Sequence, residues 1–193
     1  KLGLAETPTL FLEFHGTEAG AREQVEVFGE IARSEGALGF EWAERPEDRS
    51  RLWKARHDAL WAVKSTWPGR EAVVTDVCVP ISRLAECVEA THKDIRQSGL
   101  IAPIVGHVGD GNFHVVALCD RAQSGEMQAI EGFLERLVER ALAVDGTCSG
   151  EHGVGQGKMK YLAREHGAGL DVMRAIKAAL DPQGIMNPGK MIA

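Results

Sequence analysis

Two hydrophobic periods run along this chain. Apolar residues three or four positions apart predict amphipathic helices, and short apolar, β-branched runs bounded by glycine or proline predict strands. By these patterns we expect strands at 9–15, 39–43, 71–79, 101–105 and 113–118. We expect helices at 21–33, 46–63, 82–97, 124–144, from 158 to a break near Gly167, and 170–180, followed by a turn-rich tail at 181–190.

The order of these elements predicts an α+β fold. Strand–helix–strand occurs once and is followed by strand–helix–strand–strand–helix, an order typical of ferredoxin-like units with a mostly antiparallel sheet and helices packed on one face. A chain of 193 residues can bury its core as one domain, or at most as two small ones. The best candidate for an internal joint is WPG at 67–69, which we interpret as a loop within that domain.

The stretch GHVGDGNFH at 106–114 predicts a tight hairpin with a histidine on each side. Its GDG centre favours a turn, because glycine accepts positive φ and aspartate bonds its own backbone. Folding back would bring the imidazoles of His107 and His114 together at one end of the sheet. Since neutral imidazole is a common metal ligand, the pair is half a metal site. The alternative is a hairpin with two incidental histidines.

A second glycine-rich stretch, GTCSGEHGVG at 146–155, contains the adjacent pair Glu151 and His152. If this segment is extended, the two side chains diverge, so that one can bind a metal while the other faces a neighbouring space. Its spacing excludes nucleotide loops, since GxxxxGK[ST] requires glycine at 152 and GxGxxG requires glycine at 158. A mobile surface loop is the alternative.

Arg56 shares a face of the predicted 46–63 helix with Trp53 and Leu60. An arginine in such a position usually extends its charged end to water. Four further histidines match no motif, and we expect them to have surface or core positions: His15, His57, His92 and His166.

Composition and charge narrow the function classes. Hydrophobic content of 44% and charged content of 26% are those of an ordinary globular protein. A net charge of −6 argues against nucleic acid or an anionic membrane as the main partner. The four cysteines form no CxxC pair, which favours buried thiols in a reducing compartment. Because the sequence begins at Lys1 without a signal-peptide pattern, we expect a piece of a longer protein.

Three motifs together resemble one family. GHVGDGNFH at 106–114, SGEHGVG at 149–155 and LDPQGIMNPGK at 180–190 are similar to the C-terminal domain of FAD-linked oxidases of the vanillyl-alcohol-oxidase type. Within that family, TDVCVPISRL at 75–84 most resembles D-lactate dehydrogenase (cytochrome) and the glycolate oxidase flavoprotein subunit. The resemblance implies that residues 1–193 are the substrate-binding domain and that the N-terminal FAD-binding domain is absent from this chain.

The resemblance also implies site residues. Enzymes of this kind oxidise a D-2-hydroxy acid to the 2-oxo acid and pass the hydride to FAD. By similarity, His107, His114 and Glu151 would hold a divalent metal, zinc or manganese, and His152 would accept the hydroxyl proton.

Three further roles concern substrate and cofactor. Arg56 would bind the substrate carboxylate, Asn112 would lie near the substrate, and Asn187 would lie in a tail that returns to the flavin. Relatives that act on D-2-hydroxyglutarate carry a lysine where this chain has the apolar run AVV at 72–74. We therefore expect a monocarboxylate such as D-lactate.

The resemblance favours a cytochrome or quinone as electron acceptor, a homodimer, and a location in the cytoplasm or peripheral at the inner membrane. We expect the isolated chain to be inactive. Two function classes compete with this interpretation. One is a metal-dependent hydrolase with His152 as base, and the other is a non-catalytic ferredoxin-like binding module.

Overall fold

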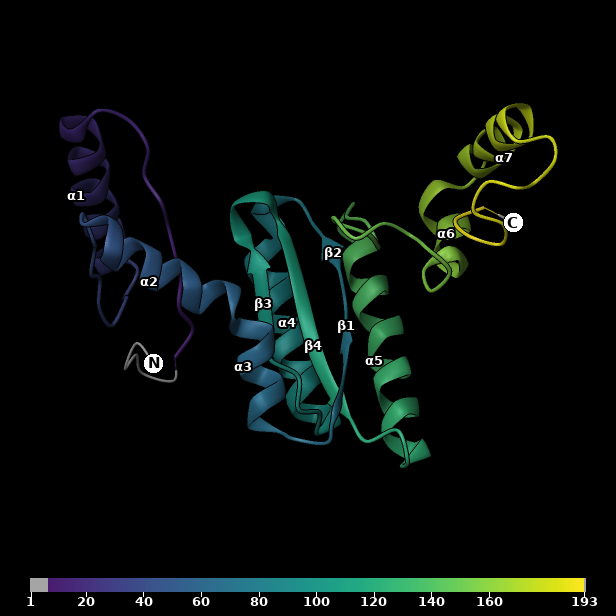
Figure 1. The fold of residues 1–193 in the computed structure, drawn as a ribbon, viewed down its shortest axis with the longest axis horizontal. Coiled ribbons are helices and arrows are strands. Elements are labelled where there is room, and N and C mark those ends of the chain that lie inside the picture. The colour runs from purple at the N-terminus through teal and green to yellow at the C-terminus, as the bar shows by residue number, and fades with distance from the viewer. Residues whose placement is uncertain (1–6, 193) are drawn as a thin grey trace. The chain divides into compact units, whose positions relative to one another are not determined.

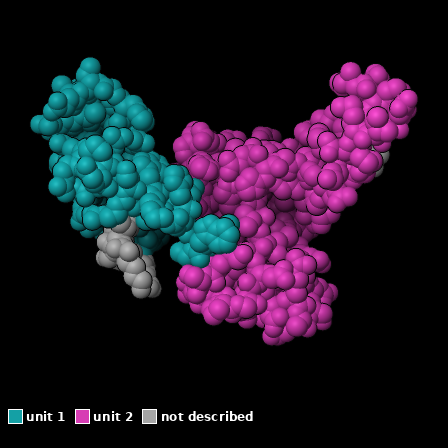
Figure 2. Space-filling view, in the orientation of Figure 1, with its two compact units in different colours: residues 1–62 teal, residues 63–193 magenta. Residues whose placement is uncertain are grey.

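The computed structural model describes residues 7–192, and the chain separates into two compact units, residues 1–62 and 63–193 (Figure 2). The boundary lies within helix α3 (Ala59–Thr66), shortly before the WPG joint at 67–69. No helix in the described residues is long and apolar enough to cross a membrane.

The first unit is helical. Helix α1 (Glu18–Ser34) begins at Thr17, whose hydroxyl accepts a hydrogen bond from the backbone N–H of Gly20. The predicted helix at 46–63 is instead two helices, α2 (Pro46–His57) and α3, because the chain leaves the helical path at Asp58. Aspartate is a weak helix former, and the Asp58 carboxylate accepts a hydrogen bond from the Lys54 ammonium.

The prediction of strands at 9–15 and 39–43 is wrong, since neither segment forms a strand in the described part of the chain. Their aromatic residues pack on α1 instead of pairing in a ladder. Phe28 of α1 lies with its ring centroid 5.9 Å from Phe14 and 5.6 Å from Phe40, and Trp42 lies 6.2 Å from Phe40. One-sided packing on a helix produces the same alternation of apolar and polar residues as a half-buried strand.

The second unit contains a four-stranded antiparallel sheet (Figure 1). Its central strand, β4 (Asn112–Cys119), is buried along its whole length. β1 (Glu71–Val74) and β2 (Val77–Cys78) follow one another along one side of β4, and β3 (Ile104–His107) pairs with the other side. The strand predicted at 101–105 begins at Ile104 in the structure, because Pro103 has no N–H to donate to the neighbouring strand.

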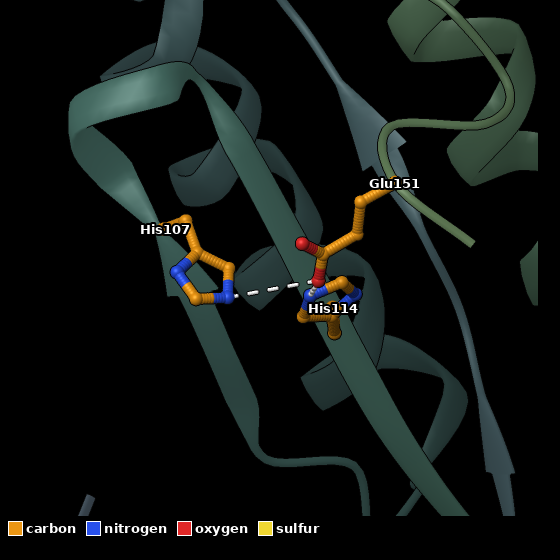
Figure 3. A group of neighbouring side chains, drawn as sticks. All are labelled: His107, His114 and Glu151. Carbon is orange, nitrogen blue, oxygen red and sulfur yellow. Dashed lines mark ion pairs between the residues drawn. The ribbon is translucent and has the colours of Figure 1, made fainter.

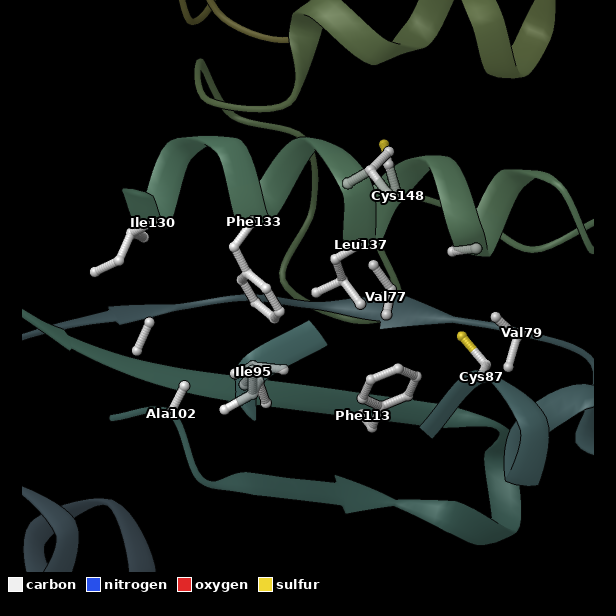
Figure 4. Close-up of a cluster of buried hydrophobic side chains, with 14 of the residues drawn as sticks. Val77, Val79, Cys87, Ile95, Ala102, Phe113, Ile130, Phe133, Leu137 and Cys148 are labelled. Carbon is white, nitrogen blue, oxygen red and sulfur yellow. The ribbon is translucent and has the colours of Figure 1, made fainter. Parts of the chain in front are cut away.

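Two helices cover one face of this sheet, as the predicted α+β fold requires. α4 (Ile81–Ser98) follows β2, and α5 (Ser124–Leu142) follows β4, which gives the ferredoxin-like order. A last strand is reduced to one bridge, between Thr147 and Cys78. Figure 4 shows Ile130, Phe133 and Leu137 pointing from α5 toward the strands.

The C-terminal segment is helical and then turn-rich. The helix predicted from Lys158 instead begins as a 3₁₀ turn, η2 (Met159–Tyr161), and continues as α6 (Leu162–His166) and α7 (Gly169–Leu180). The Glu135 carboxylate of α5 accepts hydrogen bonds from three side chains of this segment: Lys160, Tyr161 and Arg164. Beyond α7, the Asp181 carboxylate accepts hydrogen bonds from the backbone N–H groups of residues 185 and 186.

A buried carboxylate joins α4 to α5. Asp94, only 8% exposed, accepts hydrogen bonds from Arg136 and Arg140 of α5 and from Ser98 of its own helix. Burial alone would raise the pKa of Asp94, but the bonds from Arg136, Arg140 and Ser98 outweigh it and lower the pKa below its usual value.

We expect the Asp94 carboxylate to stabilise the fold above about pH 4, the usual value for an unfolded aspartate, and this contribution to fade as the pH falls toward the lower folded pKa. Asp94→Asn should therefore lower the free energy of unfolding at pH 7 by about 1–3 kcal/mol and weaken its dependence on acid. Denaturant unfolding at pH 7 and pH 3 measures both effects. Asp171→Asn, at an exposed ion pair, is the control and should change little. An unchanged acid dependence in Asp94→Asn would contradict this assignment.

Candidate metal centre

The hairpin predicted at 106–114 is present and places both histidines on one face of the sheet. A 3₁₀ turn, η1 (Val108–Asp110), and Gly111 connect β3 to β4. Gly111 has φ +77° and lies so close to β2 that a Cβ there would meet the Val79 carbonyl oxygen at 2.0 Å, so only glycine fits. His107 is the cross-strand partner of Asn112, and side chains two apart on β4 share a face, so His107 and His114 lie on the same side.

This face is opposite the one that α4 and α5 cover, because Phe113 and Val115 point into the core. The imidazole rings of His107 and His114 are 6.0 Å apart between centroids, in an edge-to-face arrangement. His114 is buried, whereas the His107 side chain is about half exposed.

Glu151 completes a cluster of three possible ligands (Figure 3). Its Oε1 lies 2.9 Å from Nε2 of His114 and 3.6 Å from Nε2 of His107. One ligand atom from each of the three residues lies within 4.8 Å of the others. A metal bound at about 2.0–2.2 Å from each ligand needs the widest of these separations to be slightly shorter. Rotation of the His107 side chain, which is about half exposed, would shorten it.

The hydrogen bond on the far side of the His114 ring fits a metal ligand. Nδ1 of His114 lies 3.0 Å from the Thr75 carbonyl oxygen, which can only accept, so Nδ1 carries a hydrogen. Nε2 faces Oε1 of Glu151 at 2.9 Å. A metal-ligating histidine commonly bonds a carbonyl through its other nitrogen, which leaves Nε2 as the ligand atom. The donor set therefore fits a divalent cation.

A break in the predicted strand at 71–79 makes the Thr75 carbonyl available. β1 ends at Val74 and β2 begins at Val77. Between them, the Thr75 hydroxyl accepts the Val115 N–H at 2.8 Å, in place of a backbone carbonyl. The Thr75 carbonyl is consequently left to accept the Nδ1–H of His114.

His152 lies against this cluster. Its ring stacks on that of His114, with centroids 4.8 Å apart and planes at 10°, and its Nε2 is 3.5 Å from Oε1 of Glu151. The segment is therefore not extended, and the divergence expected for an extended Glu151-His152 pair does not occur. Consecutive backbone N–H groups of an extended strand point to opposite sides, but those of Glu151 and His152 both point at the Asp76 carboxylate.

Sequence patterns missed two residues of this region, Asp76 and Lys158. Asp76 is 2% exposed and accepts hydrogen bonds from Asn112, from the two loop amides and from Lys158. Burial alone would raise the pKa of Asp76, but these hydrogen bonds outweigh it and hold the pKa well below its usual range. The signal that could have revealed Asp76 is a carboxylate within the apolar strand predicted at 71–79, where a charged residue is unusual.

Asn112 is buried with one unpartnered atom. Its Nδ2 donates to Asp76 Oδ1 at 2.8 Å and to the Val77 carbonyl at 3.1 Å, which orients the amide. Its Oδ1 has no hydrogen-bond partner among the described residues. Asn112 therefore has one buried acceptor without a partner, and it lies on the same face of β4 as His114.

The other two predicted site residues lie elsewhere in the chain. Arg56 is half-buried on α2 and belongs to the first unit, so its role as a carboxylate ligand stays a prediction. Asn187 is exposed in the C-terminal tail, where it has a positive φ of 48°. Its predicted place beside a flavin likewise stays a prediction.

Comparison with known proteins connects this geometry to one family. The family model described as FAD linked oxidases, C-terminal domain, matches residues 1–191. The chain is 52% identical over 192 residues to the probable mitochondrial D-lactate dehydrogenase of Danio rerio, covering 99% of this chain and 39% of that protein. It is 47% identical over 190 residues to the mitochondrial D-lactate dehydrogenase (cytochrome) of Arabidopsis thaliana, covering 98% of this chain and 34% of that one.

One more distant relative and one solved structure also match the chain. The glycolate oxidase subunit GlcD of Bacillus subtilis is 33% identical over 196 residues, covering 100% of this chain and 41% of that protein. The chain thus spans 34% to 41% of the length of these three relatives. Among solved structures, the 4-ethylphenol oxidase from Gulosibacter chungangensis, in an isoeugenol complex, matches with a TM-score of 0.56 and 20% identity over 89% of this chain and 37% of that one. That likeness shows the fold alone.

Proposed function

Because this chain belongs to the family of C-terminal domains of FAD linked oxidases, we propose that residues 1–193 are the substrate- and metal-binding domain of a flavin-dependent D-2-hydroxy-acid dehydrogenase. The observation that carries the proposal is the cluster of His107, His114 and Glu151 with His152 stacked beside it. Relatives named D-lactate dehydrogenase and glycolate oxidase subunit support this substrate class.

Each residue of the cluster has a role in this proposal. His107, His114 and Glu151 hold a divalent metal, zinc or manganese, which acts when bound as a Lewis acid that lowers the pKa of the substrate hydroxyl. His152 accepts the hydroxyl proton as general base, since its ring lies beside the ligands with half its surface exposed. FAD, held mostly by a separate domain, is the hydride acceptor.

The substrate contacts follow from residue chemistry. Arg56 binds the substrate carboxylate through its planar, two-pronged guanidinium, and the free Oδ1 of Asn112 accepts a hydrogen bond from the substrate. Asn187 approaches the flavin.

The face of the sheet that carries the site favours a monocarboxylate. Ala72 and Val74 pair with Leu118 and Val116, so they lie on the same face of the sheet as His114. Neither could bind a second carboxylate. We therefore propose D-lactate, or a similar small monocarboxylate, as the substrate.

The electron acceptor we propose is a cytochrome or a quinone, as the cytochrome-linked name of the Arabidopsis relative suggests. We propose a homodimer located in the cytoplasm or peripherally at the inner membrane.

A metal-dependent hydrolase is less well supported, because the family match extends through the C-terminal tail, for which a hydrolase has no use.

The chain as it stands should bind metal weakly or partly, should not hold FAD firmly and should not oxidise D-lactate. Substrate and the flavin domain supply the groups that complete the site. Metal and flavin analysis of the chain purified without chelator measures this, with His107→Ala expected to lose the metal. His92→Ala is the matched control, because His92 is an exposed histidine of α4 outside the cluster.

Equal metal content in the chain and in His107→Ala would contradict the ligand assignment. A yellow protein with close to one flavin per chain would contradict the proposed division between two domains.

A further inference from the structure

Asp76 is a buried carboxylate on which three other segments of the second unit converge. The hairpin contributes Asn112 Nδ2 at 2.8 Å, and the glycine-rich loop contributes the N–H groups of Glu151 at 3.1 Å and His152 at 2.9 Å. Lys158 contributes its ammonium, 3.1 Å from Oδ2 and 2.9 Å from the Asp76 carbonyl oxygen.

A carboxylate at this position is costly unless it is fully compensated. The Asp76 side chain is 1% exposed, and removing a charge from water disfavours folding unless hydrogen bonds and a counter-charge replace the water. The four donor groups supply that compensation. An apolar side chain would fill this position between β1 and β2 at lower cost, which indicates that the charge has a role.

The carboxylate determines the backbone of the loop that carries Glu151 and His152. Residues 149–153 belong to no helix or strand. The N–H groups of residues 151 and 152 both bond Asp76, and consecutive N–H groups that converge on one anion form the concave arrangement called a nest. In this conformation the side chains of Glu151 and His152 both lie against His114.

The close approach of the loop to Asp76 requires Gly150. A Cβ at this position would lie 1.9 Å from Asn112 Nδ2 and 2.8 Å from Asp76 Oδ1, so any larger residue would push the loop away. Lys158 closes the arrangement on the other side, because it bonds both the carboxylate and the carbonyl of Asp76.

We propose that Asp76 is a positioning residue of the metal site, which through the amides of Glu151 and His152 aims the carboxylate ligand and the general base, with Lys158 as its counter-charge. This inference rests on the proposed metal site and deepens it. In this role Asp76 acts through its neighbours and is not one of the three proposed ligands.

Asp76→Asn tests the inference with Co²⁺ as the probe. The amide keeps the size of the carboxylate but turns an NH₂ group toward donors, so the nest opens and the Glu151 ligand is misdirected. We expect Co²⁺ affinity, measured by absorption titration of the chain, to fall by about 10–100-fold, and the cobalt absorption bands to shift. The amide resonances of Glu151 and His152 should lose their protection from hydrogen exchange.

Two further variants separate positioning from stability. Asp94→Asn removes another buried carboxylate, far from the ligands in the α4–α5 contact, and should destabilise the fold while leaving Co²⁺ affinity unchanged. Lys158→Gln should weaken Co²⁺ binding, and Lys158→Arg should restore it in part. If Asp76→Asn does not fold, the Lys158 pair carries the test.

Unchanged Co²⁺ affinity and bands in a folded Asp76→Asn would overturn the inference, as would an equal loss in Asp94→Asn. Failure of the unaltered chain to bind Co²⁺ would instead contradict the proposed metal site. The amide protection of residues 151 and 152 would still decide whether Asp76 holds the loop.

Discussion

Replacing His152 with alanine in the proposed flavin-dependent dehydrogenase should lower turnover about 10²–10⁴-fold, the usual contribution of a positioned general base. Its ring stacks on His114 at 4.8 Å between centroids, which places it beside the ligands. The metal content should hardly change, because all three ligands remain. Steady-state kinetics with D-lactate and metal analysis of the same preparation measure both quantities.

The expected signature of His152→Ala is a loss in kcat with the metal retained. His166→Ala is the matched control, since His166 lies on α6 outside the cluster and should leave both quantities unchanged. Loss of the metal from His152→Ala would show that His152 is itself a ligand, and the proposed division of roles between the adjacent residues would be wrong.

Glu151→Ala should lose metal and activity together, which is the second large effect. The Glu151 carboxylate is the single anionic group among the three proposed ligands, and its Oε1 lies 2.9 Å and 3.6 Å from the Nε2 atoms of His114 and His107. Its removal should lower metal affinity by more than the roughly 10–100-fold typical of groups that only support a ligand. Competition with a chelator of known affinity measures the loss.

Glu151→Gln sharpens this test. The amide retains one oxygen but removes the negative charge, so metal affinity should fall to a value between those of the unaltered protein and Glu151→Ala. A Glu151→Ala protein that retains its metal but not its activity would assign the carboxylate to the base role instead.

Local pattern was sufficient for the parts of the fold in which neighbours in sequence are also neighbours in space. The 3.6 period identified α4 and α5, and the GDG turn identified the hairpin that brings His107 and His114 together. It failed where the packing partner of a segment, and not the segment's own pattern, decides its structure. Residues 9–15 alternate like a strand but pack on α1 through Phe14.

The site shows the same limit. Motif resemblance predicted the three proposed ligands, but Glu151 and His152 converge through hydrogen bonds from their amides to Asp76, 75 residues before Glu151 in the chain. No periodicity within the glycine-rich loop could reveal that its amides turn to one side. The role of Thr75 is equally hidden, because its hydroxyl replaces a carbonyl only after the sheet has formed.

The most direct test of the metal centre is anomalous diffraction from crystals of the metal-loaded protein, collected on both sides of the absorption edge of zinc or manganese. We predict a single anomalous peak within bonding distance of the Nε2 atoms of His107 and His114 and of a Glu151 oxygen, with His114 Nδ1 still bonded to the Thr75 carbonyl. A peak bound by other side chains, or no peak at the cluster in metal-loaded crystals, would contradict the account.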